Sequence, residues 1–251
     1  MLNYLLRSAE FSGLLKFVSP GFLRVLPPSQ VFQVAGQLRR NRANPIGWRG
    51  VCSEYSELLS VSDLRVRIGP ETAGSSDDPS SRSDRKAGGE TALALYFHQM
   101  LTRETWILDF RSESFSGGSS DDYRWHPQPL YYQVSTEFLR GIRSLYRGYY
   151  GSDNALFEKA LVELGLPGLQ ESLRDHFGPG DQTEVRFQLK TFQRTFARVF
   201  EACARDKLKL PRDFLVLGVA LLGLYEQLES IGLPFDVRQA YFRAAGALGA
   251  S

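Results

Sequence analysis

The sequence predicts a mainly α-helical protein with a small β element, an α+β arrangement. Apolar residues recur at helical spacing over most of the chain after residue 135, whereas β-type alternation is confined to short stretches before residue 111. With 43% apolar residues among 251, the chain can bury a sizeable core. Composition divides it into a basic helical N-terminal region (1–69), a flexible linker or loop (70–89) and a mostly helical domain (90–251).

Within the N-terminal region, leucines at helical spacing predict a first helix over 2–17. A second helix is expected from about 27 to 38, and Asn44-Pro45 indicates a turn after it. A short helix over 51–59 and an alternating strand over 64–68 complete the region.

Residues 70–89 contain no large apolar side chain, so they cannot offset their ordering entropy and are expected to be mobile. The apolar runs 91–101 and 105–110 that follow are joined by three polar residues and predict a β hairpin. A helix over 91–101 is the alternative. A second flexible insert is expected over 116–122.

From residue 135 onward the pattern predicts a series of helices. One apolar stripe covers 138–149 and ends at Gly151, after which Ser152-Asp153 caps a helix that extends to 164. A long helix is expected over 185–207. Two final helices, 214–225 and 237–248, complete the domain.

Charge is unevenly distributed along the chain, although the net charge is only +2. Residues 1–69 carry nine Lys/Arg against four Asp/Glu. The best candidates for contact with an anion or a partner are Arg39, Arg40, Arg42, Arg49 and Trp48. Alternatively, these arginines stabilise a helix C-terminus through its dipole. Four arginines make a small patch, so there is no strong nucleic-acid signal.

No metal centre, disulfide framework or membrane span is indicated. Cys52 and Cys203 are isolated, and the three histidines lack the spacing of a metal site. The longest apolar run, 214–225, has twelve residues, and a spanning helix needs about twenty. The sequence therefore predicts a cytoplasmic protein, and leaves peripheral contact with a membrane open.

The segment 106–111, Trp-Ile-Leu-Asp-Phe-Arg, predicts a buried strand that brings Asp109 to its end. A carboxylate at such a position can hold magnesium against nucleotide phosphates, or it can cap a turn beside Arg111. A nearby aromatic cluster, 123–127, can line a pocket or pack onto the core by its rings.

The C-terminal half resembles the UbiB (AarF, ADCK-like) atypical kinases. Residues 107–110 are similar to that family's Leu-Asp-Phe-Gly segment, and 138–165 are similar to the helix, turn and helix that follow it. Residues 210–224 are similar to its Leu-Pro tail helix. The resemblance implies a helical domain like a kinase C-lobe, with Asp109 binding magnesium and His98 beside ATP or ADP.

Several features of the family are missing. Arg111 replaces its glycine, and the catalytic-loop aspartate and asparagine have no counterpart, so no catalytic residue is assigned. The resemblance therefore implies a non-catalytic, pseudokinase-type accessory or binding protein. It also implies quinone or isoprenoid-lipid metabolism as the pathway and a protein or lipid-pathway component as the partner.

Two alternatives remain open. One is a divergent magnesium-nucleotide kinase or ATPase, in which His98, Asp121 or Asp122 supplies the missing groups. The other is a helical interaction scaffold that uses its basic N-terminal arm, residues 1–49.

Overall fold

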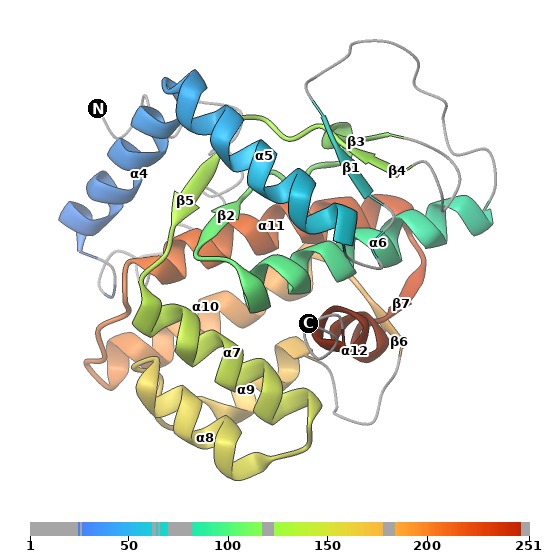
Figure 1. The fold of residues 1–251 in the computed structure, drawn as a ribbon. Helices are drawn as coiled ribbons and strands as arrows, with labels where there is room; N and C mark the ends of the chain where they lie inside the picture. The colour runs from blue at the N-terminus through green and yellow to red at the C-terminus, as the bar shows by residue number, and fades with distance from the viewer. Residues whose placement is uncertain are drawn as a thin grey trace. The chain divides into compact units, whose positions relative to one another are not determined.

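The computed structural model describes residues 25, 27–61, 64, 66–69, 82–116, 123–177 and 184–246. In this part of the chain helices dominate and the strands form three small sheets, which confirms the predicted mainly α fold with a small β element (Figure 1). The expected helix over 2–17, residues 70–81 of the expected linker, and 117–122 of the second insert lie outside the described residues.

The chain is divided into two compact units, each assembled from three separate segments. Unit 1 comprises 1–37, 134–182 and 188–222, and unit 2 comprises 38–133, 183–187 and 223–251. These limits do not coincide with the boundaries after residues 69 and 89 that composition suggested, because strand pairing and packing join segments that are distant in the sequence.

Unit 2 combines helices with all three sheets. It begins with the end of α4 (Pro28–Arg42) and includes the second half of α11 (Asp213–Ile231). Its other helices are α5 (Pro45–Val61), α6 (Arg82–Thr102), the short 3-10 helix η1 (Ser112–Ser114) and α12 (Val237–Gly246). Its strands are β1 (Val66–Ile68), β2 (Thr105–Ile107), β3 (Phe115–Ser116), β4 (Tyr123–Trp125), β5 (Tyr131–Gln133), β6 (Glu184–Arg186) and β7 (Pro234–Asp236).

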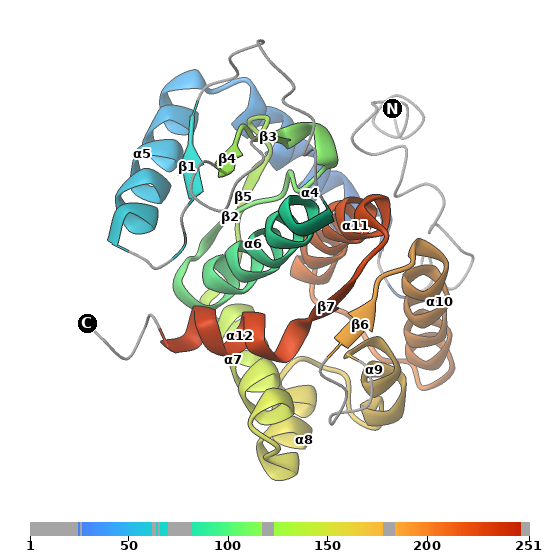
Figure 2. The ribbon, with the colours of Figure 1, turned by 90° about the vertical axis from the view of Figure 1, so that its right-hand side faces the viewer.

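The three sheets are each only two or three strands wide. In the first, β4 lies between β1, which it pairs in parallel, and β3, which it pairs antiparallel. The pairs β2–β5 and β6–β7 are antiparallel. Helix α5 contacts β1, while α6 contacts α12 and β7 (Figure 2).

The expected β hairpin over 91–110 is wrong, and the helical alternative for its first run is confirmed. Helix α6 covers Arg82–Thr102, so residues 82–89 of the expected linker form its first turns. Residues 92–101 are all buried, and a helix buried on every side shows no polar face from which its period can be read. The strand β2 does form, but its partner is β5, more than twenty residues further on.

The outer edge of β2 is covered by side chains. Ile107 donates its N–H to Gln99 Oε1 and accepts from Gln99 Nε2, each at 3.2 Å. The Tyr55 hydroxyl lies 2.8 Å from the Thr105 carbonyl oxygen and 2.9 Å from Gln99 Oε1. Because backbone groups of alternate residues point to the same side of a strand, these contacts satisfy the edge of β2 that faces away from β5.

The described residues of unit 1 form helices and the loops that join them. Besides the first part of α4 and of α11, it contains α7 (Thr136–Tyr150), α8 (Asn154–Glu163), α9 (Gln170–Phe177) and α10 (Leu189–Arg205). The helices expected over 138–149 and up to 164 are confirmed. The helix expected to begin at 185 begins at Leu189, because residues 184–186 form β6, and α9 has no counterpart among the predictions.

The α7–α8 pair shows how the sequence fixes helix ends and spacing. Ser135 and Asp153 cap the two helices by accepting from the backbone N–H of Phe138 and Leu156. The helices contact each other, and Gly141 and Gly148 of α7 lie against Leu164 and Phe157. A Cβ on Gly148 would lie 2.5 Å from the backbone nitrogen of Phe157, so only glycine permits this approach.

Helix α11 is long and apolar enough to cross a membrane by length and composition, but 72% of its most apolar window is buried within the structure. This degree of burial is the pattern of a core helix. In unit 2, Gly223 of α11 lets the backbone of Phe110 approach, because a Cβ there would lie 3.3 Å from the Phe110 nitrogen.

Candidate functional site

Asp109 lies two residues after the end of β2, close to the position that the sequence indicated, and its side chain is only 1% exposed. Residues 106–108 and Phe110, on either side of it in the sequence, are buried as well. Phe110 and Trp125 pack with ring centroids 5.3 Å apart, and Phe115 stacks on Tyr123 and Trp125. The carboxylate therefore lies in an apolar environment, in which a charge needs close partners.

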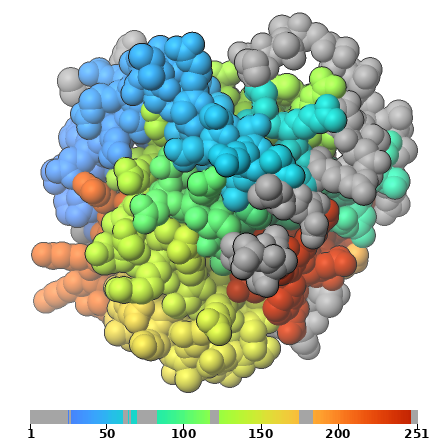
Figure 3. Space-filling model, viewed as in Figure 1, coloured from blue at the N-terminus to red at the C-terminus, as the bar shows by residue number. Residues whose placement is uncertain are grey.

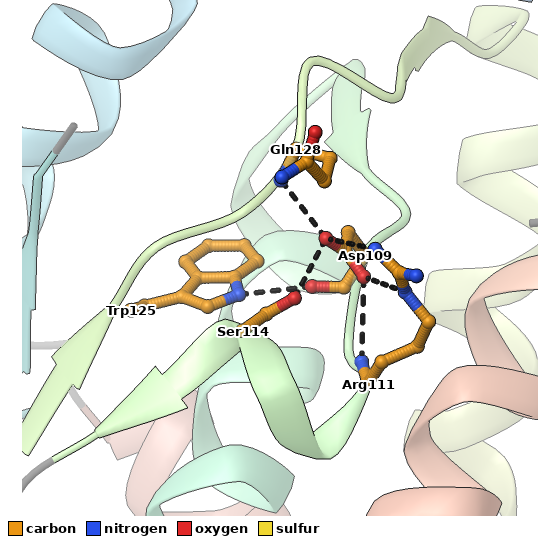
Figure 4. A network of polar contacts seen from close by, with 5 residues as sticks. All are labelled: Asp109, Arg111, Ser114, Trp125 and Gln128. Atoms are coloured by element: carbon orange, nitrogen blue, oxygen red, sulfur yellow. Dashed lines mark hydrogen bonds and ion pairs between the residues drawn. The ribbon is translucent and has the colours of Figure 1, made fainter. Parts of the chain in front are cut away.

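Both carboxylate oxygens of Asp109 accept hydrogen bonds from the chain itself (Figure 4). Arg111 donates Nε to Oδ1 at 2.7 Å and Nη2 to Oδ2 at 3.1 Å, which is a bidentate ion pair. Oδ2 also accepts from Ser114 Oγ at 2.6 Å and from the backbone N–H of Gln128 at 2.8 Å. The acceptor capacity of a carboxylate is thereby largely filled.

The backbone carbonyl of Asp109 is held too, since Trp125 Nε1 donates to it at 2.9 Å. Asp109 thus connects the end of β2 with η1, with β4 and with the segment that leads to β5. Arg111 has an extended backbone with φ −66° and ψ 156°, and this conformation needs no glycine.

The protonation state of Asp109 follows from two opposing effects. Burial raises the pKa of this carboxyl, but hydrogen bonds from Arg111, Ser114 and Gln128 and the charge of Arg111 lower it by more, so the pKa lies below its ordinary value. Asp109 is therefore ionised at neutral pH. Its negative charge is neutralised by Arg111.

This arrangement does not fit a magnesium ion. A metal ligand needs a free oxygen facing a space that further oxygen ligands share, whereas both oxygens of Asp109 are bonded to internal donors. Among the described residues there is no group of three or more His, Cys, Asp or Glu side chains that could hold a metal ion. The geometry of Asp109 is that of a structural residue, whose carboxylate holds neighbouring segments of the chain together.

His98, the second predicted cofactor contact, lies on α6 and is 3% exposed. Its ring Nδ1 is 3.5 Å from Thr102 Oγ1, and Thr102 Oγ1 donates to the His98 carbonyl at 2.7 Å. Burial, followed by the nearby charge of Arg103, lowers the pKa of His98. His98 is consequently a neutral residue of the core. Asp121 and Asp122 lie outside the described residues.

The predicted anion contacts are brought together at the corner between α4 and α5. Arg39, Arg40 and Arg42 lie in the last turn of α4, Arg49 lies in the first turns of α5, and all four are exposed. Trp48 is half-buried and stacks on Tyr131, with ring centroids 5.8 Å apart. The expected turn at Asn44-Pro45 is a single break between two helices, and Pro45 is the first residue of α5.

Sequence reasoning missed the partners of Asp109 other than Arg111. Ser114 lies only five residues away, but it is one of several serines in a polar stretch. The Gln128 contact uses a backbone N–H, which carries no sequence signal. For the cluster 123–127 the sequence allows a pocket or packing by its rings, and the burial of Tyr123 and Trp125 in β4 confirms packing.

Neither protein-family models nor the curated proteins contain a match to this sequence.

Proposed function

We propose that this protein is a non-catalytic binding or accessory protein. The observation that carries the proposal is that both carboxylate oxygens of Asp109 accept hydrogen bonds from the chain itself. A related kinase would use this residue to hold magnesium. A carboxylate bonded to Arg111, Ser114 and Gln128 stabilises the fold and has no free oxygen for a metal-nucleotide complex.

The pseudokinase-type relation to the UbiB family belongs to this proposal, as does its setting in quinone or isoprenoid-lipid metabolism. Arg111 supports it, because the substitution that removes the family's glycine also supplies the guanidinium that occupies Asp109. The protein would act in the cytoplasm by holding a protein or lipid-pathway component, and would touch a membrane only peripherally. The exposed arginines at the α4–α5 corner are the contact surface that we assign to this role.

Thermal unfolding with and without millimolar magnesium and ATP or ADP tests the proposal. A ligand at a hundred times its dissociation constant stabilises a protein by about 2.7 kcal/mol, so specific binding is readily seen. We expect no shift with either nucleotide. A magnesium-dependent shift that disappears in Asp109→Asn would contradict the proposal and favour the divergent kinase or ATPase.

A further inference from the structure

The corner between α4 and α5, residues 39–49, is here called the basic corner. It carries four exposed arginines, and no Asp or Glu occurs between residues 38 and 53. Ile46, in the first turn of α5, is 74% exposed, more than any other large hydrophobic side chain among the described residues. In Figure 3, the blue to cyan atoms of α4 and α5 lie on the face toward the viewer.

The basic corner is attached to β5 by several contacts. Asn41 Nδ2 donates to the Tyr131 carbonyl at 2.8 Å, and Trp48 stacks on the Tyr131 ring. Asn44 Oδ1 accepts from the Gly47 N–H at 3.0 Å, which caps α5. These contacts hold the backbone of the basic corner in place. A partner that binds the arginines therefore loses free energy only for ordering their side chains, and not for ordering the backbone.

The combination of groups distinguishes between classes of partner. Exposed arginines attract any phosphate-bearing surface. Binding of single-stranded nucleic acid also uses aromatic rings as stacking platforms, but Trp48, the one aromatic residue of the corner, is half-buried against Tyr131. An aliphatic side chain such as Ile46 between arginines instead suits a bilayer, where it enters the boundary between headgroups and acyl chains.

We propose that the basic corner docks on an anionic lipid surface. Arg39, Arg40, Arg42 and Arg49 contact lipid phosphates, and Ile46 inserts among the headgroups. This inference rests on the proposed function, in which the protein acts by binding, and it names the chemistry of the partner at the same surface.

Co-sedimentation with vesicles of phosphatidylcholine, with and without phosphatidylserine, tests the inference. We expect binding only to the vesicles that contain phosphatidylserine, and weaker binding as salt is raised. Each arginine near such a surface is worth about fivefold in the partition coefficient, so the triple variant Arg39→Gln, Arg40→Gln, Arg49→Gln should bind on the order of a hundredfold more weakly. Ile46→Gln should lose about tenfold.

Matched variants control for net charge and for exposed apolar area. Arg140, Lys190 and Arg194 are exposed residues of unit 1, and their triple replacement by glutamine removes the same charge. Val162 is 64% exposed, so Val162→Gln matches Ile46→Gln. Both controls should bind vesicles within about threefold of the parent, because they remove charge or apolar area outside the basic corner.

The inference is overturned if the parent protein does not bind phosphatidylserine vesicles, or if the controls lose as much binding as the corner variants. Binding of the basic corner to single-stranded RNA in place of vesicles would overturn it as well. The test is separate from that of the proposed function, since a magnesium-nucleotide shift would contradict a non-catalytic role while leaving the vesicle result unaffected.

Discussion

At the scale of single residues, Asp109 illustrates how the donors around a buried carboxylate determine its role. Arg111 lies two positions along the chain and forms a bidentate ion pair with it, and Ser114 and the Gln128 backbone fill the remaining positions. Through these hydrogen bonds and this ion pair, the Asp109 carboxylate cross-links the end of β2 to the segments that follow it.

Removing this cross-link should be costly. We expect Asp109→Ala to lower the free energy of unfolding by about 3 kcal/mol, because it removes the buried charged acceptor that Arg111, Ser114 and the Gln128 backbone share. Glu113→Ala is a control in the same stretch, at an exposed carboxylate, and should change stability by less than about 0.5 kcal/mol. Urea denaturation measures both. Equal stabilities of the two variants would show that the network is not formed in solution.

Asp109 also predicts a dependence of stability on pH. Its folded pKa lies below the ordinary value of 3.8, so the unfolded chain takes up the proton first as the pH falls. Its contribution is therefore complete above 3.8 and is lost as the pH falls through the folded pKa. The stability difference between the parent protein and Asp109→Asn, measured by urea denaturation at several pH values, should be constant near neutrality and shrink below this range. A difference that persists unchanged at low pH would exclude the carboxylate as its source.

At the scale of secondary-structure elements, local sequence signals were sufficient to predict a helix where it has capping residues and one apolar face. Ser135 and Asp153 cap α7 and α8 as their residue types indicated. Helix α6 was harder to identify because its residues 92–101 are buried on all sides, and the pairing of β2 with β5 depends on the tertiary fold. Short strands such as β6 and β7, with three residues each, are too brief to show any period.

The close approach of α7 and α8 can be tested at Gly148. In Gly148→Ala the new Cβ would lie 2.5 Å from the Phe157 nitrogen and 2.8 Å from its Cα, so the backbone of α8 must move. We expect a loss of about 1–3 kcal/mol in unfolding free energy.

A control for the helix propensity of alanine is Gly50→Ala in α5, where a Cβ meets nothing within 4 Å. It should stabilise the protein by about 0.5–1 kcal/mol, because alanine loses less backbone entropy than glycine in a helix. Circular dichroism during urea denaturation compares the two variants. If both changes stabilised the protein, the two helices would not be in the close contact described.

At the scale of the whole molecule, the sequence predicted the fold class but not the division into units. Composition suggested boundaries after 69 and 89, whereas each unit is assembled from three segments. The candidate site shows the same limit. The sequence located Asp109 after a buried strand and the arginines close together between two helices. The hydrogen bonds of the Asp109 carboxylate, however, involve residues up to nineteen positions away.

The segmented build of unit 2 predicts that residues 90–251 alone will not form a native fold. Their excision removes α5 and β1, which contribute the buried side chains of Tyr55, Leu59 and Val66 to unit 2. We expect this fragment to retain helical content but to lack a cooperative unfolding transition and a near-ultraviolet dichroism signal. A sharp transition with native-like dichroism would indicate that the predicted domain 90–251 is autonomous.

The side chains that cover the outer edge of β2 have a consequence for aggregation. An open strand edge is a template on which another chain can add a strand. Here Gln99 and Tyr55 already bind the backbone groups of Thr105 and Ile107 that such a strand would need. Side chains of two helices thus block the outer edge of β2, so a strand from another molecule cannot pair there. No further strand of the protein is needed to cover this edge.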